Sequence, residues 1–187
     1  MIIKDYIQKL TQISDEDWEV FSSKLEKQII KKNSLIIRSG EVENYLSFIE
    51  TGIVRFWIEG EDNEITFDFT FKENFFSAYL SFLTREPTNW NIQSLTPTVI
   101  WRISHADLQI IYKQTKTGEK IGRLAAENLF ITAAQRKIAL LTNTAEELYL
   151  MLFKEHLHVL KNIPLKYIAS YIGVTPQALS RIRKRIS

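Results

Sequence analysis

The spacing of apolar residues changes from helical to extended and back to helical along the chain. The segment ISDEDWEVFSSKL places Trp18, Phe21 and Leu25 three and four residues apart, as on the inner face of a helix. Ser14 stands at its start as an N-cap, and Asp17 follows three residues later, the spacing of a capping box. We therefore predict a helix near the N-terminus.

From Ser34 onward, short runs rich in β-forming residues are separated by glycines. These runs are SLIIRSGEV, YLSFIETGIVRFWIEG, NEITFDFTF and VIWRIS. In NEITFDFTF apolar and polar residues alternate, which predicts a half-buried strand with Ile65, Phe67, Phe69 and Phe71 on its inner face. Many short strands with turn signals between them predict a sandwich or jelly-roll barrel.

A helical period returns at Thr117 and continues for about 25 residues. The residues that step by three and four are Ile121, Leu124, Asn128, Ile131, Gln135 and Ile138. They form an a/d seam with polar residues at two of the a positions, as in helices that pair with a second chain. We therefore expect a dimer helix. The alternative is a helix that packs only on its own barrel.

The C-terminal part starts afresh as a separate helical unit. In TNTAEELYLMLFKEH, Thr144 and Glu147 have the spacing of a capping box. The end of the chain, YIASYIGVTPQALSRIRKRIS, has two stretches of helical spacing joined by Gly173-Val174-Thr175-Pro176. Glycine suits the left-handed residue that ends a helix, threonine is a good N-cap, and proline is favoured at a first helical position. Two helices joined in this way predict a helix-turn-helix.

The chain is therefore expected to be an α+β protein in three parts. The first is a β-barrel domain with an N-terminal helix over residues 1–116. The second is a long helix over residues 117–143, and the third is a helix-turn-helix domain over residues 144–187. A length of 187 residues with 45% hydrophobic composition is sufficient for one or two domains of ordinary size.

Composition excludes several classes of site. The chain has no cysteine, which rules out disulfides, thiolate zinc sites and cysteine-ligated iron–sulfur clusters. No run approaches the roughly 18 apolar residues of a membrane span, and the N-terminus MIIKDYIQKL lacks a secretory hydrophobic region. We therefore expect a cytoplasmic protein without membrane contact.

The net charge of +2 hides a basic C-terminal end. From His156 onward the chain has no acidic residue, and its basic residues there are Lys161, Lys166, Arg181, Arg183, Lys184 and Arg185. A basic end combined with a helix-turn-helix indicates a surface that binds nucleic acid. The alternative is a solvated C-terminal helix.

The order of barrel, long helix and helix-turn-helix resembles the Crp/Fnr family of bacterial transcription regulators over nearly the whole chain. LIIRSGEVENYLSFIETGIVRFWIEG is similar to the first barrel strands of that family, and IASYIGVTPQALSRIRKRI is similar to its DNA-reading unit. The resemblance implies a jelly roll like that of cyclic-nucleotide-binding domains, a homodimer, and double-stranded DNA as a partner. It makes RNA polymerase a candidate partner as well.

One face of the last helix is expected to contact DNA. The residues spaced to face inward are Leu179, Ile182 and Ile186. The residues expected to contact DNA are Gln177, Ser180, Arg181 and Lys184, with Thr175, Arg183 and Arg185 as phosphate contacts. The resemblance places Gln177 and Arg181 at base-reading positions, and arginine pairs well with guanine and glutamine with adenine. Pro176 stands where the family's best-known readers have arginine, so their target sequence does not transfer.

The segment FFSAYLSFLTREPTNWNI matches the effector pocket of the resembled family. Its candidate pocket residues are Phe76, Ser77, Ala78, Tyr79, Arg85, Thr88 and Asn89. Cyclic-nucleotide-binding members carry a Gly-Glu pair that holds the ribose and an Arg-Ser pair that holds the cyclic phosphate. Here Ser77-Ala78 and Thr88-Asn89 stand at those positions. A buried phosphate needs a fixed cation, which Thr88 cannot supply, and Arg85 is the nearby substitute. We therefore expect no control by cyclic AMP.

The remaining residues of this segment are largely apolar and aromatic, which leaves a filled core and a pocket for another small molecule as alternatives. We expect no cofactor, because haem ligands would have to come from His105, His156, His158 or the two methionines, outside the predicted pocket.

We also expect no enzyme. A metal-dependent enzyme of the cupin type would need several inward-facing histidines and a carboxylate on neighbouring strands of the barrel. The sequence also contains none of the catalytic motifs G-x-S-x-G, the phosphate loop or H-E-x-x-H. The main alternative to a DNA-binding regulator is a ligand-binding or protein-interaction module whose helical tail does not bind DNA.

Overall fold

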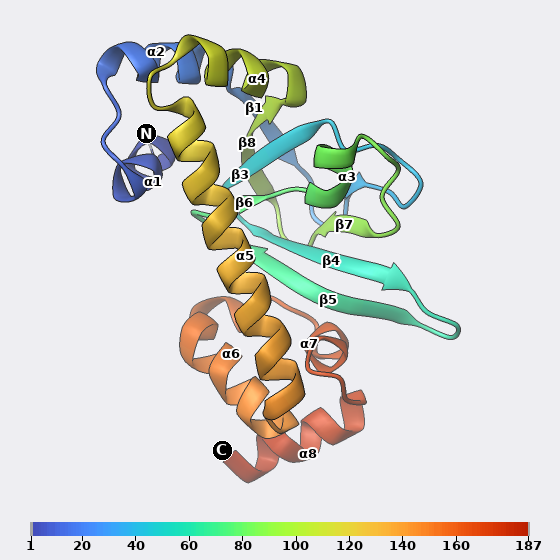
Figure 1. Cartoon of the computed structure of the whole chain (residues 1–187). Helices are drawn as coiled ribbons and strands as arrows, with labels where there is room; N and C mark the ends of the chain where they lie inside the picture. Colours follow the sequence, from blue (N-terminus) through green and yellow to red (C-terminus); the bar gives the residue numbers. More distant parts are fainter. Residues whose placement is uncertain (1, 187) are drawn as a thin grey trace.

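The computed structural model describes residues 2–186, except for the side chains of residues 155–159, and has the α+β fold expected from the sequence. A two-sheet β-barrel lies on one side of the molecule. The long helix α5 (Gly118–Thr142) runs past the barrel to a helical unit at the far end (Figure 1).

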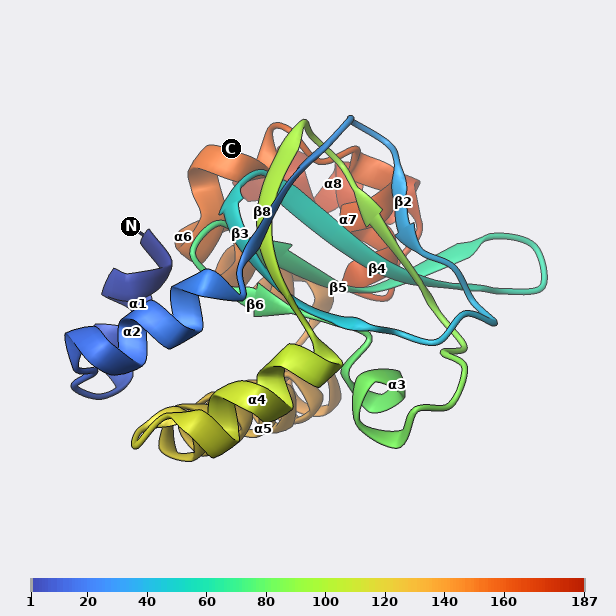
Figure 2. The same cartoon turned by 90° about the horizontal axis from the view of Figure 1, so that it is seen from above.

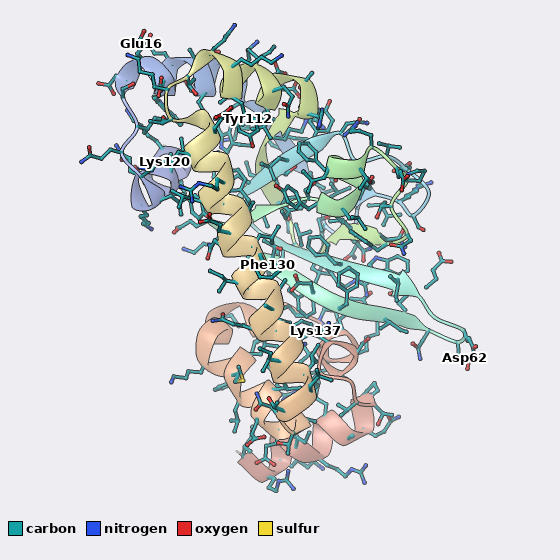
Figure 3. All side chains as sticks on the ribbon, viewed as in Figure 1. Glu16, Asp62, Tyr112, Lys120, Phe130 and Lys137 are labelled. Atoms are coloured by element: carbon teal, nitrogen blue, oxygen red, sulfur yellow. The ribbon has the colours of Figure 1, made fainter. Side chains whose placement is uncertain are left out.

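The barrel consists of two antiparallel sheets of four strands each. The first has the order β1-β8-β3-β6 and the second the order β2-β7-β4-β5. The strands are β1 (Glu26–Ile30), β2 (Leu35–Ile37), β3 (Tyr45–Thr51), β4 (Ile53–Glu59), β5 (Glu64–Phe71), β6 (Phe75–Phe76), β7 (Asn91–Ser94) and β8 (Thr98–Ser104). The hairpin of β4 and β5 extends beyond the rest of the barrel, with Asp62 at its tip (Figure 3).

The inner faces of the two sheets meet in an apolar core. Its buried residues are Ile30, Ile37, Ile49, Val54, Phe56, Phe76, Ala78, Ile92 and Ile100. They come from strands of both sheets and from the segment after β6, so side chains fill the centre of the barrel.

The predicted alternation along β5 is correct in only half of the strand. Phe69 and Phe71 are buried, but Ile65 and Phe67 are exposed and Thr66 between them is buried. The reason is a β-bulge, because the register between β4 and β5 shifts at Phe56/Trp57. A shift of one residue exchanges the two faces of a strand.

A second apolar cluster joins the barrel to four helices and to the start of α5. These helices are α1 (Ile2–Leu10), α2 (Asp15–Ser23), α3 (Tyr79–Thr84) and α4 (His105–Gln114). Their buried residues include Ile3 and Ile7 of α1, Phe82 of α3 and Ile111 of α4. Viewed from above, α4 lies over the upper end of α5 while α1 and α2 flank the barrel (Figure 2).

Asp17 has a different partner from the one expected. The Ser14 hydroxyl accepts from the Asp17 amide (3.1 Å), so Ser14 caps α2 as predicted. The Asp17 carboxylate does not close a capping box but accepts from the backbone of Lys116 (3.1 Å) and Thr117 (3.0 Å) and from the Thr117 hydroxyl (2.7 Å). It therefore caps the start of α5 from another helix.

The helical unit contains α6 (Ala145–Leu160), α7 (Leu165–Tyr171) and α8 (Pro176–Ile186). The capping box before α6 is confirmed, because the Thr144 amide donates to Glu147 (2.7 Å) and the Glu147 amide to Thr144 (3.3 Å). Gly173 has a φ of 77° between α7 and α8, in the left-handed region that favours glycine. The predicted two-helix motif is present.

The helical unit shares a core with the barrel. Leu148, Ile168 and Leu179 of α6, α7 and α8 belong to one buried cluster with Ile53 and Phe69 of the β4–β5 hairpin. The third part of the chain is therefore packed on the barrel by apolar contacts as well as joined to it by α5.

Candidate nucleic-acid interface

The last helix presents one apolar and one polar face. Leu179 is fully buried in the shared core, and Ile182 packs against the same core. The exposed residues of the opposite face are Gln177, Ser180, Arg181 and Lys184. Their spacing of three and four residues places them on a single stripe. The structure thus brings these four predicted DNA contacts together on the surface.

The start of α8 is fixed by Thr175. Its hydroxyl accepts from the Ala178 amide (3.2 Å), as an N-cap does, while the residue itself stays exposed. In α7, Ala169 is fully buried, and its carbonyl accepts from Val174 (2.9 Å) in the turn. The small alanine allows the turn to pass close to α7.

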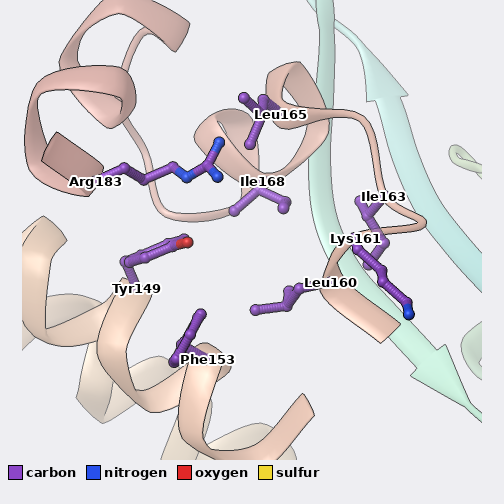
Figure 4. A pocket seen from close by; sticks show the side chains of 8 residues that line it. All are labelled: Tyr149, Phe153, Leu160, Lys161, Ile163, Leu165, Ile168 and Arg183. Atoms are coloured by element: carbon purple, nitrogen blue, oxygen red, sulfur yellow. The ribbon is translucent and has the colours of Figure 1, made fainter. Parts of the chain in front are cut away.

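Two predicted phosphate contacts point toward the helical unit itself. The Arg185 guanidinium makes an ion pair with Glu146 of α6. Arg183 lines a cavity of about 570 Å³ between α6, α7 and α8, together with Tyr149 and Ile168 (Figure 4). Both arginines are nevertheless exposed, so each lies at the surface while it also contacts its own domain. The sequence could not reveal this, because the acidic partner of Arg185 lies on a different helix.

The predicted seam of α5 is only partly exposed. Ile121 is buried among the N-terminal helices, so its assignment to a dimer face is corrected to the core of its own chain. Leu124 is half-buried, and the other four seam residues, Asn128, Ile131, Gln135 and Ile138, are exposed. The seam is thus split between the core and the surface.

The most exposed apolar side chains of α5 were missed by the seam pattern. Phe130 is 74% exposed and Leu141 is 78% exposed. They are eleven residues apart, which is about three helical turns, so both lie on one side of the helix. Figure 3 shows Phe130 near the middle of α5 and Lys137 further along it. In the sequence, both Phe130 and Leu141 stand outside the a and d positions of the seam. The signal that could have found them was a further apolar stripe beside those positions.

The candidate effector segment is occupied by contacts within the chain. Ser77 is buried, and its hydroxyl donates to the Tyr45 carbonyl (2.9 Å). Ala78 is fully buried, and its amide donates to Glu43 (3.3 Å). Glu43, which no pattern in the sequence indicated, is a buried carboxylate whose pKa is raised by burial. A carboxylate thus stands near Ala78, but it comes from the segment before β3.

The Arg85 side chain is engaged with the loop before β3. Arg85 ends α3 with a φ of 62°, and its guanidinium donates to the Glu43 carbonyl (2.7 Å) and to Asn44 (2.5 Å). Thr88 is buried and forms backbone hydrogen bonds with Glu41 and Gly40, whereas Asn89 is exposed. The guanidinium therefore holds a loop outside the barrel core.

The aromatic candidates divide between two clusters. Phe76 lies in the barrel core, where its ring contacts that of Phe56 (6.4 Å between centroids). Tyr79 instead packs with the N-terminal helices, and its ring stacks on Phe82 (6.1 Å). The structure therefore does not gather the predicted pocket residues around one cavity.

Among the residues whose side chains are described, no group of three or more histidine, cysteine, aspartate or glutamate side chains is placed to hold a metal ion. His105 packs against Phe82 (5.1 Å between ring centroids), and His156 and His158 lie outside the described side chains.

Over the described part of the chain, none of the helices is both long and apolar enough to cross a membrane.

Comparisons with known proteins identify a domain and a fold. Residues 27–115 match the family model of the cyclic nucleotide-binding domain. No curated protein matches the chain in sequence. Many solved structures match it in fold.

The matches to three of the solved structures span most of this chain and most of the other protein. FixK2 from Bradyrhizobium japonicum is 18% identical with a TM-score of 0.71, covering 87% of this chain and 84% of its own. A putative regulator of the crp/fnr family from Eubacterium rectale is 15% identical with a TM-score of 0.69, covering 93% and 83%. A CooA mutant from Carboxydothermus hydrogenoformans is 17% identical with a TM-score of 0.67, covering 94% and 86%. Residues 27–115 are therefore similar to the cyclic nucleotide-binding domain, and the fold of the chain is that of the Crp/Fnr regulators, as the sequence resemblance implied.

Proposed function

We propose that this protein is a DNA-binding transcription regulator that acts as a homodimer. The observation that carries the proposal is the exposed polar stripe of α8, which lies opposite the buried Leu179. A helix-turn-helix places such a stripe in the major groove, with the first helix of the pair beside the backbone.

Two side chains of the stripe are suited to base edges. Gln177 and Arg181 are one helical turn apart, and both are exposed. Arginine forms two hydrogen bonds with guanine, and glutamine forms two with adenine. Ser180 and Lys184 lie on the same stripe and suit phosphate oxygens, as does the exposed Thr175 at the start of the helix.

Pairing through α5 would place two copies of α8 on one duplex. A dimer of this type binds two half-sites about 34 Å apart, which is one turn of DNA. The exposed apolar residues of α5, with Phe130 and Leu141 foremost, support the dimer because a lone helix in water does not usually leave such side chains uncovered.

We further propose that cyclic AMP is not the effector. The engagement of Arg85 with Glu43 and Asn44, and the neutral Ala78 and Thr88 at the nucleotide-holding positions, support this. A buried cyclic phosphate without a paired cation would be strongly disfavoured.

The test is a selection of genomic DNA fragments by the purified full chain. We expect enrichment of fragments that share a sequence with two-fold symmetry, and loss of enrichment when Gln177 and Arg181 are both replaced by alanine. Recovery of fragments without a shared sequence, or the same enrichment by the double variant, would contradict the proposal.

A further inference from the structure

The helix-turn-helix rests on the free edge of the barrel. β5 is the outermost strand of its sheet, and α7 contacts it, as both Figure 1 and Figure 2 show. The Thr66 amide of β5 donates to the Ser170 hydroxyl of α7 (2.8 Å), and that hydroxyl lies 3.4 Å from the Glu64 carbonyl. An edge strand presents unpaired backbone groups, and here a helix covers them.

A fully buried arginine lies at the centre of this contact. Arg55 of β4 has 0% of its surface exposed. Its guanidinium carbon is 3.7 Å from the centroid of the Tyr167 ring of α7, and its Nη2 atom is 2.8 Å from Glu64. Arginine stacks on aromatic faces through its planar guanidinium, so Arg55 joins the barrel to the first helix of the pair.

A second arginine holds the other end of α7 to the long helix. Arg136 of α5 donates to the Tyr171 carbonyl (2.6 Å), and its guanidinium carbon is 3.7 Å from the centroid of the Tyr171 ring. α7 is therefore clamped between the β4–β5 hairpin and α5. Because α8 follows α7 through a four-residue turn, the clamp also sets the position of α8.

The contact around Arg55 is incompletely hydrogen-bonded. Among the described protein atoms, Arg55 Nε and Nη1 have no acceptor, and the buried Trp57 indole N–H is likewise unmatched. Burying a cation whose donors are unmatched costs free energy, and its carboxylate partner, Glu64, is itself partly exposed. The stacking on Tyr167 and the burial of charge therefore oppose each other, which favours a contact that can open.

We propose that Arg55 and Tyr167 form a releasable latch that positions α8 relative to α5. The inference rests on the proposed DNA-binding function, since its consequence is the distance between the two reading helices of a dimer. With the latch closed, α8 has one position and one half-site spacing fits. With the latch open, α8 is less restrained and the spacing is less strictly defined.

The latch can be measured without DNA, by hydrogen exchange at the Thr66 amide in the full chain. Tyr167→Ala removes the stacking on Arg55 and should speed this exchange at least tenfold. Arg55→Met fills the space without a buried charge and should slow the exchange at least threefold, because a hydrophobic side chain often replaces a buried ion pair without loss. Opposite signs from two changes at one contact cannot arise from a general loss of folding.

Arg102→Met is the matched control. Arg102 of β8 lies in the other sheet, where it also stacks on a ring, Tyr45 (4.0 Å), and pairs with a carboxylate, Glu26 (3.0 Å). The variant Arg102→Met should leave hydrogen exchange at the Thr66 amide unchanged. If Tyr167→Ala also leaves it unchanged, the latch is refuted. If Arg55→Met speeds it, the buried charge does not weaken the contact, and the claim that the latch is releasable is wrong.

DNA duplexes of altered spacing test the positioning role. With the selected half-sites moved one base pair closer or further apart, the unmodified protein should lose at least tenfold in affinity and Tyr167→Ala less than threefold. A variant that exchanges faster at Thr66 yet keeps the full spacing preference would overturn the positioning role. If no variant binds any duplex, the proposed function fails, and with it the positioning role, while the exchange data still decide whether the latch exists.

Discussion

The arginine and lysine side chains of α8 divide into two groups according to their neighbours. Arg181 and Lys184 are exposed on the polar stripe, whereas Arg185 pairs with Glu146 and Arg183 lines the cavity beneath α6. The charge of the helix is therefore not spread evenly around its axis. At the scale of single residues, two of its cations lie on the exposed polar stripe and two contact their own domain.

Arg181→Ala and Lys184→Ala should have different effects on DNA binding. If Arg181 bonds a guanine with two nitrogens, its removal should cost about 1–3 kcal/mol and relax the preference at one base position of each half-site. Lys184→Ala leaves one phosphate of each half-site without its cation, so binding should weaken equally on all sequences. The salt slope should then fall by about one for each such phosphate. Binding to a panel of single-base variants at several salt concentrations measures both effects.

Arg185→Ala is the control for loss of charge alone. Because Arg185 is paired with Glu146, its removal should change neither the ranking of target sequences nor the salt slope by as much as Lys184→Ala does. An unchanged ranking of targets in Arg181→Ala would show that this face of α8 is not in the groove.

At the scale of elements, the start of α5 depends on a side chain from α2. Asp17 accepts three hydrogen bonds from Lys116 and Thr117. These bonds, that from the Thr117 hydroxyl foremost, hold the pKa of Asp17 below its ordinary value of 3.8. Two helices nearly a hundred residues apart in sequence are thus joined by one carboxylate.

Asp17→Asn should destabilise the protein at neutral pH by about 1–3 kcal/mol, because a charged acceptor of part-buried N–H groups is lost. Because folding lowers the pKa of Asp17, its contribution is present above 3.8 and is lost as the pH falls through the lower, folded-state pKa. The difference between the two proteins in urea unfolding should therefore shrink at strongly acidic pH.

The matched control is Asp15→Asn. Asp15 lies on the same helix, but its side chain is exposed and forms a surface ion pair with Lys4. Its replacement should change the free energy of unfolding by less than about 1 kcal/mol. Equal effects of the two changes would contradict the capping role of Asp17.

The segment from β6 to β7 should not bind cyclic nucleotides. Calorimetric titration of the protein with cyclic AMP and with cyclic GMP should give no heat of binding, because Arg85 is engaged with Glu43 and Asn44 outside the barrel core. A micromolar Kd would contradict this, and its loss in Arg85→Ala would show that the guanidinium turns inward to hold the phosphate.

At the scale of the whole molecule, one apolar core extends from the barrel into the helical unit, while α5 leaves large side chains uncovered. The two features are complementary. The shared core places the helix-turn-helix on its own chain, and the uncovered side of α5 is the surface through which a second chain would place its own.

Replacing Phe130 and Leu141 by glutamate should convert the dimer to a monomer that binds DNA weakly. Both side chains are more than 70% exposed, so the change should leave the fold of one chain intact. Light scattering gives the mass, and circular dichroism confirms folding. Leu80→Glu, at an exposed leucine of α3, is the control and should remain dimeric. If the unmodified protein is already a monomer at micromolar concentration, pairing through α5 is wrong.

The sequence alone determined the elements with strong local signals. Ser14, the Thr144–Glu147 box and the turn at Gly173 mark helix ends through contacts within a few residues, so propensity and spacing were sufficient to locate them. The order of these elements also indicated the fold, and the spacing on α8 indicated its exposed stripe.

Only the tertiary structure decided which long-range partners these residues have. The bulge that reverses Ile65 and Phe67, the pairing of Arg185 with Glu146 and the capping of α5 by Asp17 each depend on segments distant in sequence. Arg55 is the clearest case, because a lone arginine in a strand gives no sign of the ring that will cover it. Periodicity reports which face of an element is apolar, but what lies against that face is set by packing of the whole chain.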